Sequence, residues 1–341
     1  MGSFDHAVGV RSPTQRDVDR GYVLAAAATA FGDAATVVDA EPFTGGSFGS
    51  VWRVELADRG PVVLKISATP DAGLLTYERG MLAEEANYLR TAAAGAPELP
   101  VARVLHQTQD WLFMTLLPGT PLPFLPPDTD TTRVRQECGA AIARLHRVSG
   151  DLFGYPGDRP NATSWPDAFT AMIEAILHDA VVWRVHLPLP PDRLRAVVRT
   201  HRGLLAAVTR PAFVHFDLWD GNVLATVDGD GAHLSGLVDG ERYLFGDPMV
   251  DLASPALFAD VLDPPGHPFL RGYTSVTPLT IDEGVRRRVW LYQLYLYLIM
   301  IVEYPSRGMT PGADPVRWAL LGRLVIDLVD RLTGGDTDPG Q

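Results

Sequence analysis

The centre of the chain reads Phe213-Val214-His215-Phe216-Asp217-Leu218-Trp219-Asp220-Gly221-Asn222, and Asp239 follows seventeen residues after Asn222. An apolar strand end leads into a carboxylate, and an amide stands five positions further on. Strands expected at 222–226 and 233–238 form a hairpin about Asp228-Gly229-Asp230-Gly231. This hairpin is expected to bring the second carboxylate to the same side as the amide.

The spacing His-x-Asp-x-x-x-x-Asn with a later Asp is typical of loops that transfer a phosphoryl group. Such a transfer needs a carboxylate to orient the attacking hydroxyl and hard oxygen ligands to hold Mg²⁺. We therefore expect Asp217 to be the catalytic base, and Asn222 and Asp239 to be catalytic metal ligands. His215 is expected to brace the loop by hydrogen bonding rather than to carry a proton.

A glycine-rich turn lies upstream, between the first two of three strands predicted at 36–43, 51–56 and 61–67. The turn is either a plain hairpin or a loop whose backbone N–H groups approach phosphates. The third strand favours phosphates, because Lys65 is embedded among aliphatic residues and a buried lysine is costly without an anion. The turn residues assigned to nucleotide binding are Gly45, Gly46, Ser47, Phe48 and Gly49.

A helix predicted at 75–94 carries Glu78, Glu84 and Glu85. A lysine held over phosphates needs a carboxylate to fix it, and we assign Glu85 because Ala86 and Leu89 beside it continue the apolar stripe. A solvated surface position is the alternative for Glu84, and for Glu85 as well.

Two further strands, at 100–107 and 111–117, end at Pro118-Gly119. In a two-lobe kinase this is where the lobes join and the adenine ring lies, so Met114 and Leu116 are expected to offer backbone hydrogen bonds to that ring. Two ordinary edge strands and a turn are the alternative. Helices are predicted after them at 134–148, 165–185, 192–208, 249–262, 281–303 and 315–332. The order predicts an α+β fold with an N-lobe at 1–117, which includes a leading helix at 15–31, a helical C-lobe at 118–333 and a tail at 334–341.

The net charge of −12 disfavours nucleic acid and anionic membrane as partners and suits a cationic small ligand, or it serves solubility alone. The single cysteine, Cys138, excludes an intrachain disulfide and indicates a reducing compartment. No secretory signal is visible at the N-terminus, so we expect a cytoplasmic protein. The apolar run at 289–302 is too short to span a bilayer and is expected to be a core helix.

Several of these segments together resemble the aminoglycoside phosphotransferase and choline kinase family, which has a protein-kinase-like, two-lobe fold. The resemblance implies ATP or GTP as phosphoryl donor, Mg²⁺, and the roles already given to Asp217, Asn222 and Asp239. It also makes Asp247 and Asp251 bracing or substrate-side carboxylates, with bracing favoured. The segments are Thr44–Ser50, Leu64-Lys65, Glu85, Leu145-His146, His215–Asn222 and Val238–Ala253.

The chain departs from the family pattern in places. Many antibiotic kinases carry glycine where this chain has Phe216, and Leu218-Trp219-Asp220-Gly221-Asn222 is similar to the loop of fructosamine kinases. Asp239 is followed by Gly240-Glu241, and only a few residues separate it from Gly246-Asp247-Pro248, which leaves no room for a long activation segment. A small acceptor is therefore expected rather than a protein.

The resulting hypothesis is a kinase for a hydroxyl of a small, cationic molecule, with an aminoglycoside-like or other amine-bearing natural product as leading acceptor. The alternatives are a metabolic kinase for choline, a sugar or a sugar amine, and a nucleotide-binding regulator without catalysis. The candidate ammonium partners form a pool of carboxylates in the helical lobe: Glu174, Asp179, Asp251, Asp260 and Glu303.

Overall fold

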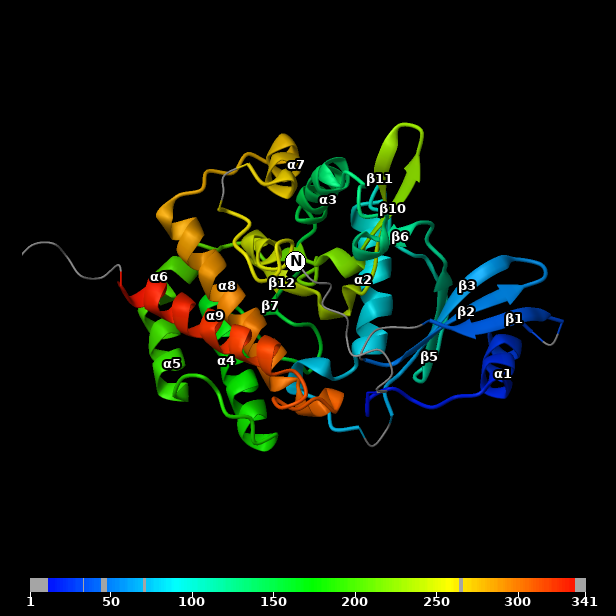
Figure 1. The fold of residues 1–341 in the computed structure, drawn as a ribbon, viewed down its shortest axis with the longest axis horizontal. Helices are drawn as coiled ribbons and strands as arrows, with labels where there is room; N and C mark the ends of the chain where they lie inside the picture. The colour runs from blue at the N-terminus through cyan, green and yellow to red at the C-terminus, as the bar shows by residue number, and fades with distance from the viewer. Residues whose placement is uncertain (1–11, 33, 44–47, 70–71, 264–265, 335–341) are drawn as a thin grey trace, which may run out of the picture.

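The computed structural model describes residues 12–32, 34–43, 48–69, 72–263 and 266–334 (Figure 1). Its N-terminal part is built on an antiparallel sheet in the order β1-β2-β3-β5-β4. The strands are β1 (Val37–Pro42), β2 (Ser50–Leu56), β3 (Gly60–Ile66), β4 (Val104–Gln107) and β5 (Trp111–Thr115). All five predicted strands are confirmed, with ends that differ by at most four residues.

Each face of this sheet is covered by a helix. On one face, α1 (Arg20–Phe31) packs its buried Val23 and Ala27 in a cluster with Val62 and Leu64 of β3. The alternation of side chains along a strand then directs Val63 and Lys65 to the other face, where α2 (Met81–Gly95) lies. In Figure 1, α2 stands between the sheet and the helical part of the molecule.

The helix predicted at 75–94 is divided into two elements. A short 3₁₀ turn, η1 (Thr76–Glu78), precedes α2, and Gly80 between them has φ +69°. A residue in the left-handed region cannot continue a right-handed helix, and glycine adopts this region without steric cost. The prediction of one continuous helix was therefore wrong at Gly80.

The rest of the chain is mainly helical. Its long helices are α3 (Thr132–Leu145), α4 (Trp165–Val182), α8 (Glu283–Val302) and α9 (Pro315–Gly334), and its shorter ones are α5 (Pro191–Thr200), α6 (Arg202–Leu205) and α7 (Pro268–Val276). Every residue of α8 from Leu291 to Val302 is buried, which confirms the core helix expected there. Within the described ranges, no helix has the length and apolar character needed to cross a membrane.

Two predicted helices differ from the structure. The segment at 192–208 forms α5 and α6 with a break at His201. The segment at 249–262 forms only the 3₁₀ turn η5 (Pro248–Leu252) followed by irregular turns. Pro255 explains this second difference, because proline removes a backbone donor and disfavours helix in the residue before it. Helix α7, which was not predicted, follows these turns.

Short strands place the central segments next to each other. The predicted hairpin is present as β10 (Val223–Asp228) and β11 (Gly231–Leu237), and β10 also pairs with β6 (Thr120–Pro121). A second small sheet has the order β8-β7-β12-β9, formed by β7 (Phe153–Gly154), β8 (Asn161–Ala162), β9 (Ala212–Val214) and β12 (Leu244–Gly246). Because β9 leads into His215 and β12 follows Tyr243, their pairing sets the 215–222 segment beside the 238–243 segment.

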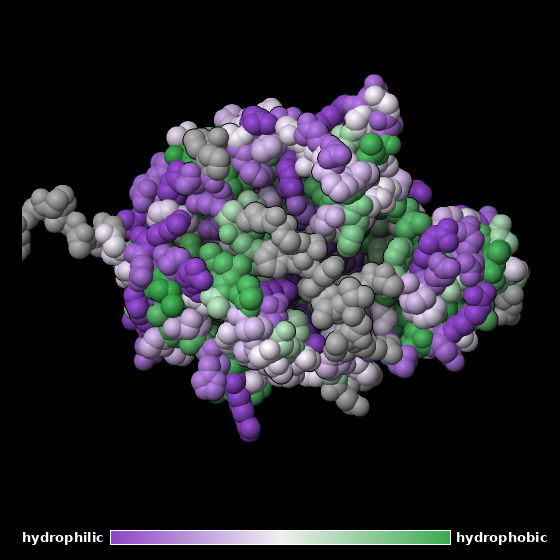
Figure 2. All heavy atoms as spheres, viewed as in Figure 1, coloured by the Kyte–Doolittle hydropathy of each residue, from purple (hydrophilic) through white to green (hydrophobic). Residues whose placement is uncertain are grey.

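We propose that the two lobes meet at 117/118, as expected from the sequence. Strand β5 ends at Thr115, and β6 already pairs with β10 of the helical part. On the face drawn in Figure 2, hydrophilic side chains cover much of both parts, and smaller groups of hydrophobic side chains lie among them.

Candidate active site

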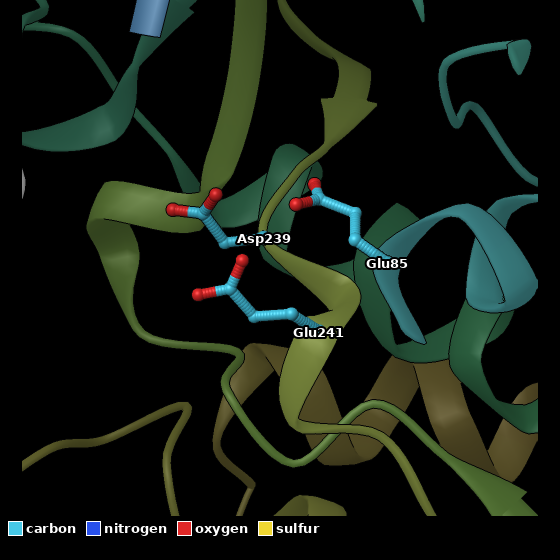
Figure 3. A group of neighbouring side chains, drawn as sticks. All are labelled: Glu85, Asp239 and Glu241. Carbon is cyan, nitrogen blue, oxygen red and sulfur yellow. The ribbon is translucent and has the colours of Figure 1, made fainter. Parts of the chain in front are cut away.

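Lys65 meets three carboxylates at the boundary between the sheet and the helical part. Its Nζ lies 2.5 Å from Glu85 Oε2 in an ion pair, 3.0 Å from Asp239 Oδ1, and in hydrogen-bond contact with Glu241 Oε2. One carboxylate oxygen from each of the three acids lies within 4.8 Å of the other two, and Figure 3 shows the three carboxylates close together. The expected pairing of Lys65 with Glu85 is therefore present.

Burial and charge set the protonation of this cluster. Burial works against the ammonium of Lys65, but Asp239, Glu241 and Glu85 outweigh it and raise the pKa of Lys65 well above its usual value. Burial raises the pKa of Glu85 to about 8, against the attraction of Lys65. The charge of Lys65 lowers the pKa of Asp239. The lysine is thus firmly cationic and Asp239 firmly anionic.

Asp217 stands in the adjacent segment with its side chain 19% exposed. Burial raises its pKa to about 6, although Arg242, whose Nε lies 3.8 Å from Asp217 Oδ2, opposes the rise. The backbone N–H of Asp217 donates to His215 Nδ1 at 3.2 Å, so the histidine braces the loop as expected. A carboxylate with this pKa is ionised at neutral pH and still basic enough to accept a hydroxyl proton.

Asp251 holds the backbone directly before Asp217. Its two oxygens accept the N–H groups of His215 (3.0 Å) and Phe216 (2.6 Å), and His146 Nε2 lies 2.8 Å from Oδ2. Asp251 is fully buried, so it is a brace and has no surface open to an acceptor.

Phe216 has φ +70°, in the region that favours glycine. Its buried ring stacks on Tyr295 with centroids 5.8 Å apart. The glycine of many antibiotic kinases would suit this backbone, whereas here ring packing offsets the strain. The Trp219 ring packs against Gly221. A Cβ on residue 221 would lie 2.2 Å from this ring, so the contact requires glycine there.

The residues expected to hold a metal fit Mg²⁺ chemically. The Asn222 amide nitrogen donates to Asp217 O at 2.9 Å, which leaves Oδ1 as the amide's acceptor atom. Val238 N donates to Asn222 O at 3.1 Å and brings Asp239 next to Asn222 along the backbone. The Asp239 side chain is 49% exposed, so a carboxylate oxygen remains accessible. Amide and carboxylate oxygens are the hard ligands that Mg²⁺ prefers.

The glycine-rich turn is only partly covered by the structure, since Gly45, Gly46 and Ser47 lie outside the described residues. Gly49 has φ +65°, and a Cβ there would lie 2.8 Å from Ile66 O, so the turn passes close to β3. The Phe48 ring lies under the guanidinium of Arg307, 5.0 Å from centroid to Cζ.

The two residues expected at the adenine differ in position. Met114 lies inside β5, paired with Val63 on one side and Val104 on the other, and its side chain is buried. Leu116 lies beyond the last residue of β5. Leu116 is therefore better placed than Met114 to offer its backbone to a base.

Each of the five candidate ammonium partners has a partner within the protein. Glu174 pairs with Arg195, Asp179 accepts from Thr76, Asp251 braces the loop, Asp260 accepts from Trp290, and Glu303 pairs with Arg242 and Arg307. Asp179, Asp251 and Glu303 are buried, and a buried carboxylate needs such internal partners.

Three residues near the site were missed from the sequence. Glu241 shares Lys65, and Arg242 lies between Asp217 and Glu303. Glu84, read as a surface charge, is only 14% exposed and accepts from Tyr243 Oη at 2.7 Å. The adjacent charges of Glu241-Arg242 directly after Asp239 were the available signal for the first two.

The chain is similar to a curated protein, to several solved structures and to one family model. In Synechocystis sp., a probable ketoamine kinase is 30% identical over 169 residues, which are 46% of this chain and 52% of that protein. The chain thus spans about half the length of this curated relative.

Solved structures share the fold. A putative fructosamine-3-kinase from Thermobifida fusca matches with a TM-score of 0.64 and 23% identity over 89% of this chain and 99% of that one. An aminoglycoside phosphotransferase in ternary complex with AMP-PNP and hygromycin B matches with a TM-score of 0.60 and 18% identity, over 93% and 99% of the two chains. The two-lobe, protein-kinase-like fold expected from the sequence is confirmed by these matches.

The family model described as the phosphotransferase enzyme family matches residues 39–286, which include most of the sheet, α2 and all the central segments. The chain belongs to this phosphotransferase family.

Proposed function

We propose that this protein is an ATP- or GTP-dependent O-phosphotransferase that transfers the γ-phosphoryl group to a hydroxyl of a small, amine-bearing molecule. The observation that carries the proposal is the meeting of Lys65, Glu85 and Asp239, which come from a strand, a helix and the end of a hairpin. The acidic neighbours keep the buried lysine cationic, and a cationic lysine beside the proposed metal-binding Asp239 is suited to binding phosphates.

The proposed roles follow from the contacts. Glu85 orients Lys65, whose ammonium binds the phosphates of the donor. Mg²⁺, held by Asn222 and Asp239, would neutralise charge on those phosphates. Asp217 accepts the proton of the acceptor hydroxyl as its oxygen bonds to the γ-phosphorus. The bond from that phosphorus to the bridging oxygen breaks, and the nucleoside diphosphate leaves with the electron pair.

The acceptor class is the finer part of the proposal. A sugar amine of the ketoamine type is supported by the curated relative and by the fructosamine-kinase-like loop at 218–222. An aminoglycoside-like natural product is supported by the solved relative bound to hygromycin B. The acidic balance of the chain suits both, because both carry amines.

We also propose that the protein works in the cytoplasm. Cys138 is buried and burial raises the pKa of its thiol to about 12, which suits an unreactive structural thiol in a reducing compartment.

The test is phosphoryl transfer by purified protein with MgATP or MgGTP. The acceptor panel holds a ketoamine of an amino acid, choline, a simple sugar and several aminoglycosides, and product formation is followed by ³¹P NMR. Transfer to at least one acceptor is expected, and Asp217→Ala should lower kcat by about 10²–10⁴-fold. Asp128→Ala, at an exposed position, is the matched control.

Two outcomes would contradict the proposal. Nucleotide binding without transfer to any acceptor would favour a regulator that has lost catalysis. Undiminished transfer by Asp217→Ala would overturn the assignment of the base.

A further inference from the structure

Near its start α2 carries two adjacent glutamates that face different parts of the molecule. Glu85 reaches Lys65 of the sheet, whereas Glu84 reaches the helical part. Glu84 Oε2 accepts the hydroxyl of Tyr243 at 2.7 Å and lies 3.6 Å from an Nη atom of Arg159. The helix is thus held from both sides within a single turn.

The partners of Glu84 are themselves fixed. Arg159 donates through Nη1 to the backbone oxygens of Tyr77 and Glu241, each at 3.3 Å, and through Nε to Pro156 O. Tyr243 is buried and follows Arg242 directly in the chain. Glu84 is therefore bound to groups that also hold the segment carrying Asp239 and Glu241.

Packing keeps α2 close to the same segment. A Cβ on Gly240 would lie 2.1 Å from the Tyr88 ring, so only glycine allows this approach. Tyr88 also stacks on Phe213, with centroids 5.3 Å apart. At its start α2 has Gly80 as N-cap with no side-chain cap, so the position of the first turn depends on such tertiary contacts.

We propose that Glu84 is a positioning residue that, through Tyr243 and Arg159, holds α2 where Glu85 can orient Lys65. The inference rests on the proposed function, because it concerns the lysine assigned to the phosphates. Glu84 acts through Glu85, so its loss weakens nucleotide binding only while Glu85 is able to pair with Lys65.

The test is a double-mutant cycle read out by equilibrium binding of a fluorescent ATP analogue with Mg²⁺. Glu84→Ala, and separately Tyr243→Phe, should weaken binding by about five- to twentyfold. In a Glu85→Gln background the same changes should alter binding by less than about twofold. Glu84→Gln retains an acceptor for Tyr243 and should restore most of the affinity.

Arg90→Ala, on the exposed side of α2, is the matched control and should bind as the wild type does. Tyr243→Phe removes a single hydroxyl, so it keeps the test decisive even where Glu84→Ala impairs folding. Unchanged affinity in the Glu84 and Tyr243 variants, or an equal loss in the Glu85→Gln background, would overturn the inference alone. A wild-type protein that binds no nucleotide would overturn the proposed function and the inference with it.

Discussion

The backbone N–H of Phe216 donates to Asp251 Oδ1 at 2.6 Å. The other oxygen of the same carboxylate accepts the N–H of His215 at 3.0 Å, so one side chain orients two successive peptide groups directly before Asp217. The position of the base is therefore set through the backbone, from a residue that lies 34 positions further along the chain.

Asp251→Asn should damage both stability and catalysis. An amide oxygen can replace only one of the two acceptors, and the amide nitrogen would face an N–H donor in a fully buried site. We expect the free energy of unfolding to fall by about 1–3 kcal/mol. We expect kcat to fall at least about tenfold, because misplacing a reacting group is costly. Urea denaturation and steady-state kinetics test this, with exposed Asp128→Asn as control. An unchanged kcat would show that the loop is oriented by other contacts.

The second prediction concerns the stability of variants at Phe216, whose backbone is left-handed. Phe216→Gly relieves strain of about 1–2 kcal/mol, but it removes a buried ring whose loss costs about 3–5 kcal/mol. The variant should therefore be less stable than the wild type. Phe216→Ala loses the ring without relief of the strain, so it should be the less stable of the two variants. Comparing their unfolding free energies isolates the backbone effect, and a more stable alanine variant would contradict it.

Much of the fold followed from periodicity. Alternation in β3 predicted a strand with Lys65 on one face, and the hydrophobic run at 289–302 predicted the buried part of α8. Predictions from periodicity were wrong where a single residue overrides a longer pattern. Gly80 separates α2 from η1 through its left-handed backbone, and Pro255 prevents a helix after Leu252. These effects depend on local backbone conformation, which the apolar spacing of the neighbouring residues does not reveal.

The site was predictable in its spacing but not in its tertiary partners. The distance in sequence between His215 and Asn222 indicated the loop, and the stripe beside Glu85 selected the correct glutamate for Lys65. Glu303 pairs with Arg307, four residues further along the chain, and with Arg242, which only the fold brings near the end of α8. A carboxylate in a sequence shows its charge, whereas its availability to a ligand depends on what packs against it.

The pH dependence of the reaction should report Asp217. Its pKa of about 6, raised by burial, implies that the base is ionised above pH 6 and protonated below it. We expect kcat/KM to fall tenfold per pH unit on the acid side, with a midpoint near 6. Nucleotide affinity measured over the same range controls for protonation of the donor. A midpoint near 4 would indicate a solvated carboxylate.

The same pKa predicts a stability effect of Asp217→Asn. Folded protein keeps a proton on Asp217 up to about pH 6, whereas the unfolded chain releases it near pH 4. The wild type therefore loses stability at this position as the pH rises from 4 to 6, and the asparagine variant does not. The variant's unfolding free energy should rise relative to that of the wild type by on the order of 2–3 kcal/mol across this range. A difference that stays constant with pH would contradict the raised pKa.

Arg135 ties the end of the loop to α3 through a bidentate ion pair. Its two Nη atoms donate to Asp220 Oδ1 at 2.6 Å and Oδ2 at 2.7 Å, at the start of the turn η3 (Asp220–Asn222). The side chains are 23% and 38% exposed, so the pair contributes only about 0–1 kcal/mol to stability. Its larger effect should be on the orientation of Asn222, the proposed metal ligand. Lysine keeps the charge but cannot form both hydrogen bonds.

Arg135→Lys should therefore raise the Mg²⁺ concentration that gives half-maximal activity, by about three- to tenfold, while the unfolding free energy changes by less than about 1 kcal/mol. Arg133→Lys is the matched control, because Arg133 lies on the same helix and pairs with Glu137 at its exposed surface. An equal effect in both variants would assign the change to the helix in general. An increase in the required Mg²⁺ concentration confined to Arg135→Lys would link the bidentate pair at Asp220 to Asn222, the proposed metal ligand two residues away.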